Sequence, residues 1–273
     1  TIPVLALGGL GVGLITRYFA PETKGHGVPE VMLSVAQEGG RIRARVTLLK
    51  ALAAAVCIGS GGSAGREGPI VQIGSAFGSM LGQWFRMPDR RVLLSVACGA
   101  AGGIAATFNA PMAGVIFALE VILARFTALS FGLVVMSSAT ATVVARSLGE
   151  EGDSPAFALV QEHGMQGVSD LLFFIVLGVL CAFVAHFYTR ALYAVEDVSD
   201  RVRVPEALKP AIGGAVVGVL ALGAPEVMGT GYASIEAALN NQLVMGTLFV
   251  LCFAKVAGTC MTIGTGGSGG IFA

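Results

Sequence analysis

The feature that most constrains this chain is a set of long segments without any charged side chain. Residues 92–119 contain no Asp, Glu, Lys or Arg, and neither do residues 126–145 or 210–225. A helix needs about 20 predominantly apolar residues to cross the hydrocarbon core of a bilayer. Charged residues make up only 12% of the chain, against about 25% in a typical soluble domain. The sequence therefore predicts an all-α, polytopic membrane protein.

The composition also argues against several other classes of protein. The formal net charge is zero, so we expect no basic surface for nucleic acid. The three histidines are far apart, and the cysteines lie in apolar stretches without metal-ligand spacing. We therefore expect no metal, no cofactor and no nucleic-acid partner. No set of nucleophile, base and metal is visible, so an enzyme is not expected.

Apolar patterning predicts a series of helices, many of them too short to cross a bilayer. Their approximate ranges are 3–19, 29–37, 44–58, 69–85, 91–107, 110–124, 128–147, 168–195, 207–223, 233–240 and 242–262. Broken helices inside a membrane need protein or a water-filled cavity to satisfy their freed backbone groups. We expect tilted, broken helices here, with aqueous loops at residues 149–153 and 197–205.

The sequence also repeats itself. Three blocks recur in the same order, residues 6–13, 20–27 and 50–65 matching residues 211–218, 224–231 and 255–270. The offset is 205 residues for the first and third blocks and 204 for the second, so one single-residue gap reconciles all three. Transporters built from two repeats place their site at the repeat interface, where discontinuous helices meet.

This repetition predicts a division of the chain into three parts. Residues 1–147 form a first inverted repeat that lacks its start, and residues 148–206 form a connecting loop and a long helix. Residues 207–273 begin a second repeat. We expect both ends of this chain to be truncations, since Thr1 is not an initiator methionine and Ala273 interrupts an apolar run.

The first motif is Gly25-His26-Gly27-Val28-Pro29. Its glycines permit a sharp turn, and a proline suits the first turn of a helix. A helix N-terminus carries a partial positive charge and unpaired N–H donors, which together can bind an anion without a cation. A plain loop-to-helix cap is the alternative.

The second motif, Gly65-Arg66-Glu67-Gly68-Pro69, places two charges in an otherwise uncharged stretch. Ionisable groups within a membrane are candidates for function. An ionised Glu67 can occupy the anion position itself, and a protonated or displaced Glu67 swings away. Glu67 is thus a candidate gate coupled to protons. The alternative is an ordinary acidic cap paired with Arg66.

Two further motifs complete the set. Asn109-Ala110-Pro111 opens a helix that reaches Glu120, a lone acid for which a water-facing position at a helix end is the alternative to a functional role. Residues 264–273 repeat the glycine-rich loop before the second motif, and the amides of Ile271 and Phe272 would again face an anion.

In this order and at these distances, the four motifs resemble the selectivity-filter segments of the CLC family of chloride channels and transporters. The resemblance implies the CLC-type fold of two inverted repeats, assembled as a double-barrelled homodimer with one pore in each subunit. It implies that Glu67 is the gate and that the anion is bound by His26, Gly27, Arg66, Gly270, Ile271 and Phe272. The three filter segments are then Gly25, His26, Gly27, Val28 and Pro29; Gly65, Arg66, Glu67, Gly68 and Pro69; and Gly270, Ile271, Phe272 and Ala273.

Two positions depart from the family pattern. His26 replaces the usual serine, and because histidine titrates near pH ~6.5, anion affinity or conductance should rise as the pH falls through that range. The alternative is that the His26 side chain points away from the anion and only its backbone matters. Val121 replaces the inner glutamate of proton-coupled members. The usual proton relay is therefore absent, as in the channel branch, although Glu120 or a water chain are possible substitutes.

The sequence thus predicts a chloride conductor gated by Glu67, channel-like or weakly proton-coupled, in the inner membrane of a bacterium. The expected partners are chloride or other small anions, protons, the lipid bilayer and a second copy of the chain. The alternatives are a proton-coupled chloride or fluoride antiporter and an organic-solute transporter with inverted repeats. The prediction requires the loops at Gly25, Gly65 and Gly270 to converge on one cavity.

Overall fold

The computed structural model describes residues 1–148, 167 and 169–272. These residues form α-helices joined by short turns, with two isolated β-bridges and no extended strand. The helices are α1 (Ile2–Tyr18), α2 (Val28–Gln37), α3 (Arg45–Gly59), α4 (Glu67–Trp84), α5 (Asp89–Phe108), α6 (Pro111–Phe117), α7 (Ala128–Leu148), α8 (Ser169–Arg201), α9 (Lys209–Gly223), α10 (Tyr232–Leu239) and α11 (Met245–Gly264). The short turns η1 (Pro21–Thr23), η2 (Ala118–Ile122) and η3 (Pro225–Val227) complete the order.

Most helices lie where the sequence predicts them, and α8 is the main exception. The predicted loop at residues 197–205 is wrong over its first part, because α8 continues to Arg201. The charged residues that begin at Glu196 mark the end of the apolar segment, but they are compatible with a helix. The predicted loop at residues 149–153 lies outside the described residues.

A second difference concerns the helix predicted at residues 110–124. The structure has the short helix α6 followed by one π-helical turn, η2. Single π-helical turns of this kind are rare and frequently lie at functional sites. Both Glu120 and Val121 fall within this wider turn.

Four helices in the described part of the chain are long and apolar enough to cross a membrane. They are residues Asp89–Phe108, Ala128–Leu148, Asp170–Arg201 and Met245–Gly264. Apolar side chains along α8, from Leu171 to Phe187, are largely exposed in the isolated chain. A bilayer or another protein surface must cover so large an apolar face.

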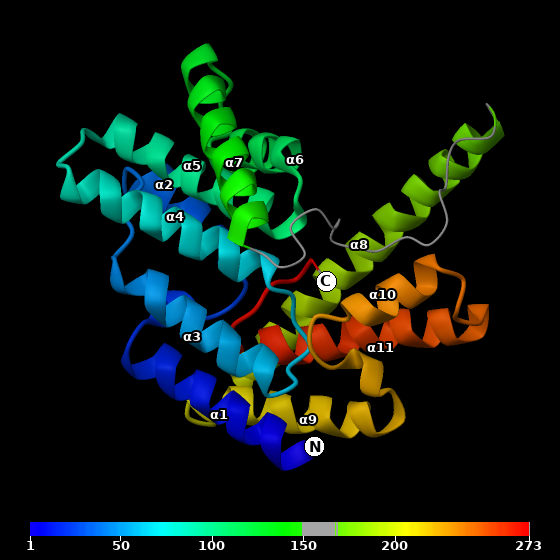
Figure 1. Ribbon diagram of the computed structural model, residues 1–273. Coiled ribbons are helices and arrows are strands. Elements are labelled where there is room, and N and C mark those ends of the chain that lie inside the picture. The colour runs from blue at the N-terminus through cyan, green and yellow to red at the C-terminus, as the bar shows by residue number, and fades with distance from the viewer. Residues whose placement is uncertain (149–166, 168, 273) are drawn as a thin grey trace.

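Small residues let the helices approach closely. Helices α4 and α5 lie side by side, and α7 packs against α5 (Figure 1). A Cβ atom placed on Gly74 of α4 would lie 2.3 Å from the carbonyl oxygen of Gly99 of α5, and one on Gly99 would lie 2.0 Å from the carbonyl oxygen of Gly74. Close backbone contact of this kind is typical of helix pairs in membranes.

Helices α1 and α9 pack with reciprocal contacts (Figure 1). A Cβ atom on Gly9 would lie 2.1 Å from the carbonyl oxygen of Pro210, and one on Gly214 would lie 2.3 Å from that of Leu5. The offset of 205 residues exchanges the two members of each pair. Reciprocal contact is the property of a two-fold axis, so α1 and α9 are related by a pseudo-two-fold axis. The three-part division of the chain stays a prediction, and residues 149–166 and 168 of its connecting part lie outside the described residues.

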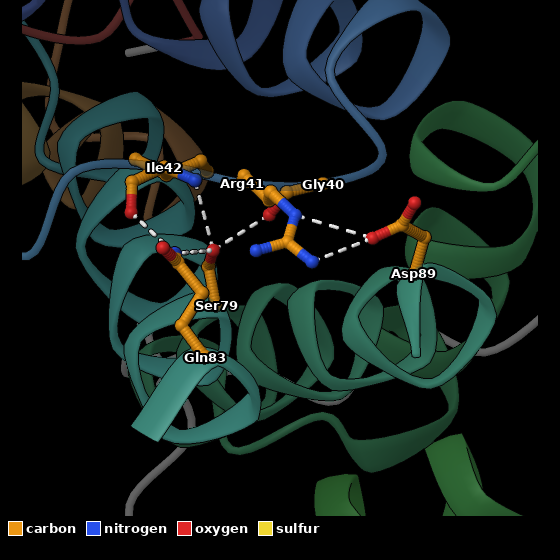
Figure 2. A network of polar contacts seen from close by, with 6 residues as sticks. All are labelled: Gly40, Arg41, Ile42, Ser79, Gln83 and Asp89. Atoms are coloured by element: carbon orange, nitrogen blue, oxygen red, sulfur yellow. Dashed lines mark hydrogen bonds and ion pairs between the residues drawn. The ribbon is translucent and has the colours of Figure 1, made fainter. Parts of the chain in front are cut away.

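A polar network anchors the loop between α2 and α3 to the C-terminal part of α4 and to the first residue of α5 (Figure 2). It is formed by Gly40, Arg41, Ile42, Ser79, Gln83 and Asp89. Ser79 Oγ donates to the carbonyl oxygen of Gly40 at 2.6 Å and accepts from the N–H of Ile42 at 2.8 Å. Arg41 donates to Asp89 through Nε at 3.1 Å and Nη2 at 2.8 Å. This network fixes the C-terminal end of α2, and thereby helps to orient its N-terminal end.

Candidate functional site: the convergence of three glycine-rich segments

The first segment, residues 25–29, pairs with the chain that leads into the third. The N–H of Gly25 donates to the carbonyl oxygen of Gly267 at 2.9 Å, and the N–H of Gly269 donates to that of Gly25 at 3.3 Å. These bonds form a parallel bridge between Gly25 and Ser268. Residues more than 240 positions apart in the sequence are thus joined through their backbones.

The second segment, residues 65–69, pairs with the third in the same way. Gly65 and Gly270 exchange backbone hydrogen bonds of 2.9 and 2.6 Å in an antiparallel bridge. A Cβ atom on Gly68 would lie only 2.2 Å from the carbonyl oxygen of His26. The three segments therefore meet near the centre of the molecule (Figure 1), as the sequence predicts, and the cavity on which they were expected to converge stays a prediction.

Three helices begin at this meeting point. Helix α2 follows Gly27 (φ 86°), α4 begins at Glu67, and α10 follows Gly231 (φ 77°). A left-handed φ of this kind is readily adopted only by glycine. None of these three N-termini has a side-chain cap. The arrangement concentrates N–H donors and the positive ends of helix dipoles.

The third segment contributes backbone amides. The N–H groups of Ile271 and Phe272 donate no hydrogen bond to any other residue that the structure describes. The carbonyl oxygen of Ile271 accepts from the Tyr188 hydroxyl at 3.3 Å, which holds the segment against α8. Ala273 lies outside the described residues.

Glu67 is buried among these elements, with 2% of its surface exposed. Its Oε1 accepts a hydrogen bond from the Tyr232 hydroxyl at the start of α10. Its Oε2 has no hydrogen-bond partner among the described residues, and a Cβ atom on Gly270 would lie 3.2 Å from it. The carboxylate thus lies between α10 and the third segment.

Arg66 does not neutralise this carboxylate. Its guanidinium lies over the Tyr232 ring, 5.0 Å from the centroid, which is within the range of a cation–π interaction. No ion pair joins Arg66 to Glu67 in the described part of the chain. The structure therefore gives no support to the alternative in which Glu67 is a simple cap paired with Arg66.

Two lysines, of which Lys50 is buried and Lys255 is partly buried, hold the loops that lead to the site. Lys50 Nζ donates to the carbonyl oxygens of Gly25 at 2.8 Å and Thr23 at 3.1 Å. Lys255 Nζ donates to that of Gly229 at 2.7 Å, and this pair is equivalent to Lys50 and Gly25 in the repeat. The sequence aligns the two lysines but does not reveal this role. The sequence signal that could have pointed to this role is a single lysine at the same position of each repeat.

The remaining predicted residues lie as follows. His26 Nδ1 is buried and has no hydrogen-bond partner among the described residues. Val121 packs against the hydrophobic core between α2, α4, α5 and α7. Glu120 is exposed and makes no hydrogen bond or ion pair with another described residue. The turn η2 contacts α2, and the core cluster against which Val121 packs includes Val28 of the first segment.

Comparison with known proteins gives a consistent result. A family model for the voltage gated chloride channel matches residues 8–273. A protein of Ralstonia nicotianae whose name calls it ClcB-like is 32% identical over 97% of this chain and 62% of its own length. The H(+)/Cl(-) exchange transporter ClcA of Vibrio cholerae is 34% identical over 97% of this chain and 57% of its own length.

A solved structure, a slow cyanobacterial Cl-/H+ antiporter, superposes with a TM-score of 0.83 at 28% identity. The alignment covers 100% of this chain and 65% of that one. The chain therefore spans less than two thirds of the length of the relatives that it matches.

Proposed function

Because this chain belongs to the voltage gated chloride channel family, known as the CLC family, we propose that it is the anion-conducting part of a membrane protein gated by Glu67. The observation that carries the proposal is the meeting of three uncapped helix N-termini around one buried carboxylate. Helix N-termini attract anions, and a carboxylate is itself an anion. Glu67 and a permeating chloride thus compete for the same positive potential.

Gating follows from this competition. An ionised Glu67 is held by the helix dipoles and by the Tyr232 hydroxyl, and it blocks the position that chloride would take. Protonation removes the charge that the dipoles stabilise, so the side chain is released and chloride enters. The amides of Ile271 and Phe272, with those of the first segment, replace part of the hydration shell of the ion.

The proposed transport mode is channel-like or weakly coupled to protons. Valine at position 121 cannot carry a proton, and it packs into an apolar core. A proton-coupled antiporter is the second candidate, because the names of two relatives describe exchange of chloride and protons. Exposed Glu120, on the same π-helical turn, is the nearest acid in the sequence that such a mode would use.

A flux assay separates these modes. The full-length protein is reconstituted in liposomes under opposed chloride and proton gradients, and the reversal potential is measured. A channel gives a reversal potential set by chloride alone, and a shift with the proton gradient would establish the antiporter. Fluoride in place of chloride tests halide preference in the same assay.

The same assay tests the proposal as a whole. The absence of any anion flux would contradict it and would favour an organic-solute transporter with a related design.

We further propose a homodimer with one pore in each subunit, embedded in a bacterial inner membrane, in which the partner or lipid covers the apolar face of α8. Cross-linking of the full-length protein in native membranes tests the dimer.

A further inference from the structure

We propose that Tyr232 is a positioning residue that latches Glu67 in its closed, ionised state. This inference rests on the proposed function, in which Glu67 is the gate. The tyrosine comes from α10 and the glutamate from α4, 165 residues earlier. The latch therefore ties the gate on one side of the pseudo-two-fold axis to the helix N-terminus on the other side.

The ring of Tyr232 is held in place by its surroundings. It stands at the first position of α10, directly after Gly231 in a left-handed conformation. The Arg66 guanidinium lies over the ring, and Lys255 fixes the preceding loop through the carbonyl oxygen of Gly229. A hydroxyl with so little freedom can hold a carboxylate in one place at a small entropic cost.

The charged and titratable groups near Glu67 come from several elements. Arg66 precedes it on the chain, Tyr232 faces it from α10, and Lys255 acts on it from α11. The first segment contributes the titratable residue His26, whose backbone oxygen lies against Gly68. Tyr232 differs from the others because it alone donates a hydrogen bond to the carboxylate among the described residues.

A hydrogen bond to an ionised acceptor is stronger than one to a neutral acceptor. The Tyr232 hydroxyl therefore stabilises the ionised carboxylate more than the protonated acid. Removing the hydroxyl favours protonation, and thereby favours the open gate. Without the hydroxyl, the pH at which acid opens the gate is therefore higher.

The test compares Tyr232→Phe with wild type in the full-length protein, reconstituted in planar bilayers or liposomes. The pH on the side that Glu67 senses is varied while chloride conductance is measured. We expect the midpoint of activation to move upward by about one pH unit, the equivalent of one charge-assisted hydrogen bond. Tyr193→Phe is the matched control, because Tyr193 lies on α8 with 57% of its surface exposed, and its midpoint should equal that of wild type.

A double mutant separates a latch from a general effect on the pore. In the Glu67→Gln background, Tyr232→Phe should leave the conductance and its pH profile unchanged. That result also shows that the phenylalanine variant folds. An equal change in both backgrounds would overturn the latch, because the tyrosine would then act on the pore and not on the gate.

The remaining outcomes distinguish the two proposals. If wild type conducts chloride with pH-dependent gating and Tyr232→Phe matches it, the latch is overturned while the proposed function stands. If wild type conducts no anion, the proposed function fails. A parallel upward shift in Tyr232→Phe and Tyr193→Phe would likewise contradict the latch.

Discussion

At the scale of single residues, the proposed function depends on one buried carboxylate. Glu67 has one oxygen bound to a tyrosine hydroxyl and the other without a hydrogen-bond partner among the described residues. A charge is tolerated in such a place only where fixed dipoles or opposite charges compensate its lost hydration. Here the N-terminus of α4 supplies that compensation, and it also attracts the permeating anion.

Replacing Glu67 by glutamine tests the gate. The amide has the shape of the protonated acid. It lacks the negative charge by which the helix dipoles hold the ionised side chain in place. Conduction by Glu67→Gln at saturating chloride, where anion affinity no longer limits it, should be largely insensitive to pH on the side that the gate senses, with an open fraction at least that of acid-activated wild type. Chloride conductance between pH 5 and 8 is the measurement, and unchanged pH gating would remove Glu67 from this role.

His26 is the second residue with a testable role. Its Nδ1 is buried without a hydrogen-bond partner among the described residues, at the place where the family usually has serine. An imidazolium attracts an anion more strongly than the neutral ring, and burial together with the charge of Lys50 lowers the pKa of His26, so anion affinity should rise only as the pH falls below about 6.5, the value of a free histidine. Chloride affinity is measured as a function of pH in the single variant Glu67→Gln and in the double variant Glu67→Gln/His26→Ser. Identical profiles would refute this role.

At the scale of elements, pairs of glycines allow helices to touch through their backbones. Gly9 and Gly214 occupy equivalent places on α1 and α9, each facing a carbonyl oxygen of the other helix. A side chain added at either glycine would push the two helices apart and weaken the dispersion contacts across their interface. The reciprocal geometry therefore makes a quantitative prediction.

Gly9→Ala and Gly214→Ala should destabilise the protein by similar amounts, about 1–3 kcal/mol each, as expected for an overpacked interface. Gly223→Ala at the end of α9 is the control, because a Cβ atom there meets no other atom within 4 Å. Thermal unfolding of the full-length protein in detergent provides the measurement. A loss in only one of the two glycine variants would contradict the pseudo-two-fold packing.

The lysine pair gives a second prediction at this scale. Lys50→Met removes one donor from each of the carbonyl oxygens of Thr23 and Gly25, which keep the Ser268 hydroxyl and the Gly269 N–H as donors, and each lost hydrogen bond from the charged ammonium costs about 1.5–3 kcal/mol. We expect lower stability and weaker chloride binding, measured by calorimetry on the full-length protein. Exposed Lys24→Met is the control. Equal chloride affinity in both variants would show that Lys50 does not support the site.

The sequence predicts the helices well, since several of them (α1, α2, α6 and α9) have Pro at one of their first two positions and others (α3, α9 and α11) end at Gly. It misplaces the end of α8, because charged residues leave the apolar segment without breaking the helix. It also misses the π-helical turn at residues 118–122, since no composition distinguishes a π turn from an α turn. Tyr232 escapes notice for another reason: its contact with Glu67 exists only once α4 and α10 are placed in space.

At the scale of the whole molecule, the main point is that distant segments meet through their backbones. Residues 25, 65 and 270 come from separate parts of the chain, and hydrogen bonds join them. The repeat in the sequence indicates this meeting, because related repeats place their broken helices at a common interface. The sequence does not reveal the bonds themselves, since backbone pairing depends on the tertiary fold.

The central claim is that this meeting point binds an anion. Its most direct test is a crystal structure of the full-length Glu67→Gln protein grown in bromide, with data collected at the bromine absorption edge. We predict an anomalous peak between the N-termini of α2 and α4 and the amides of Ile271 and Phe272. Bromide peaks elsewhere, with none at this position, would contradict the account.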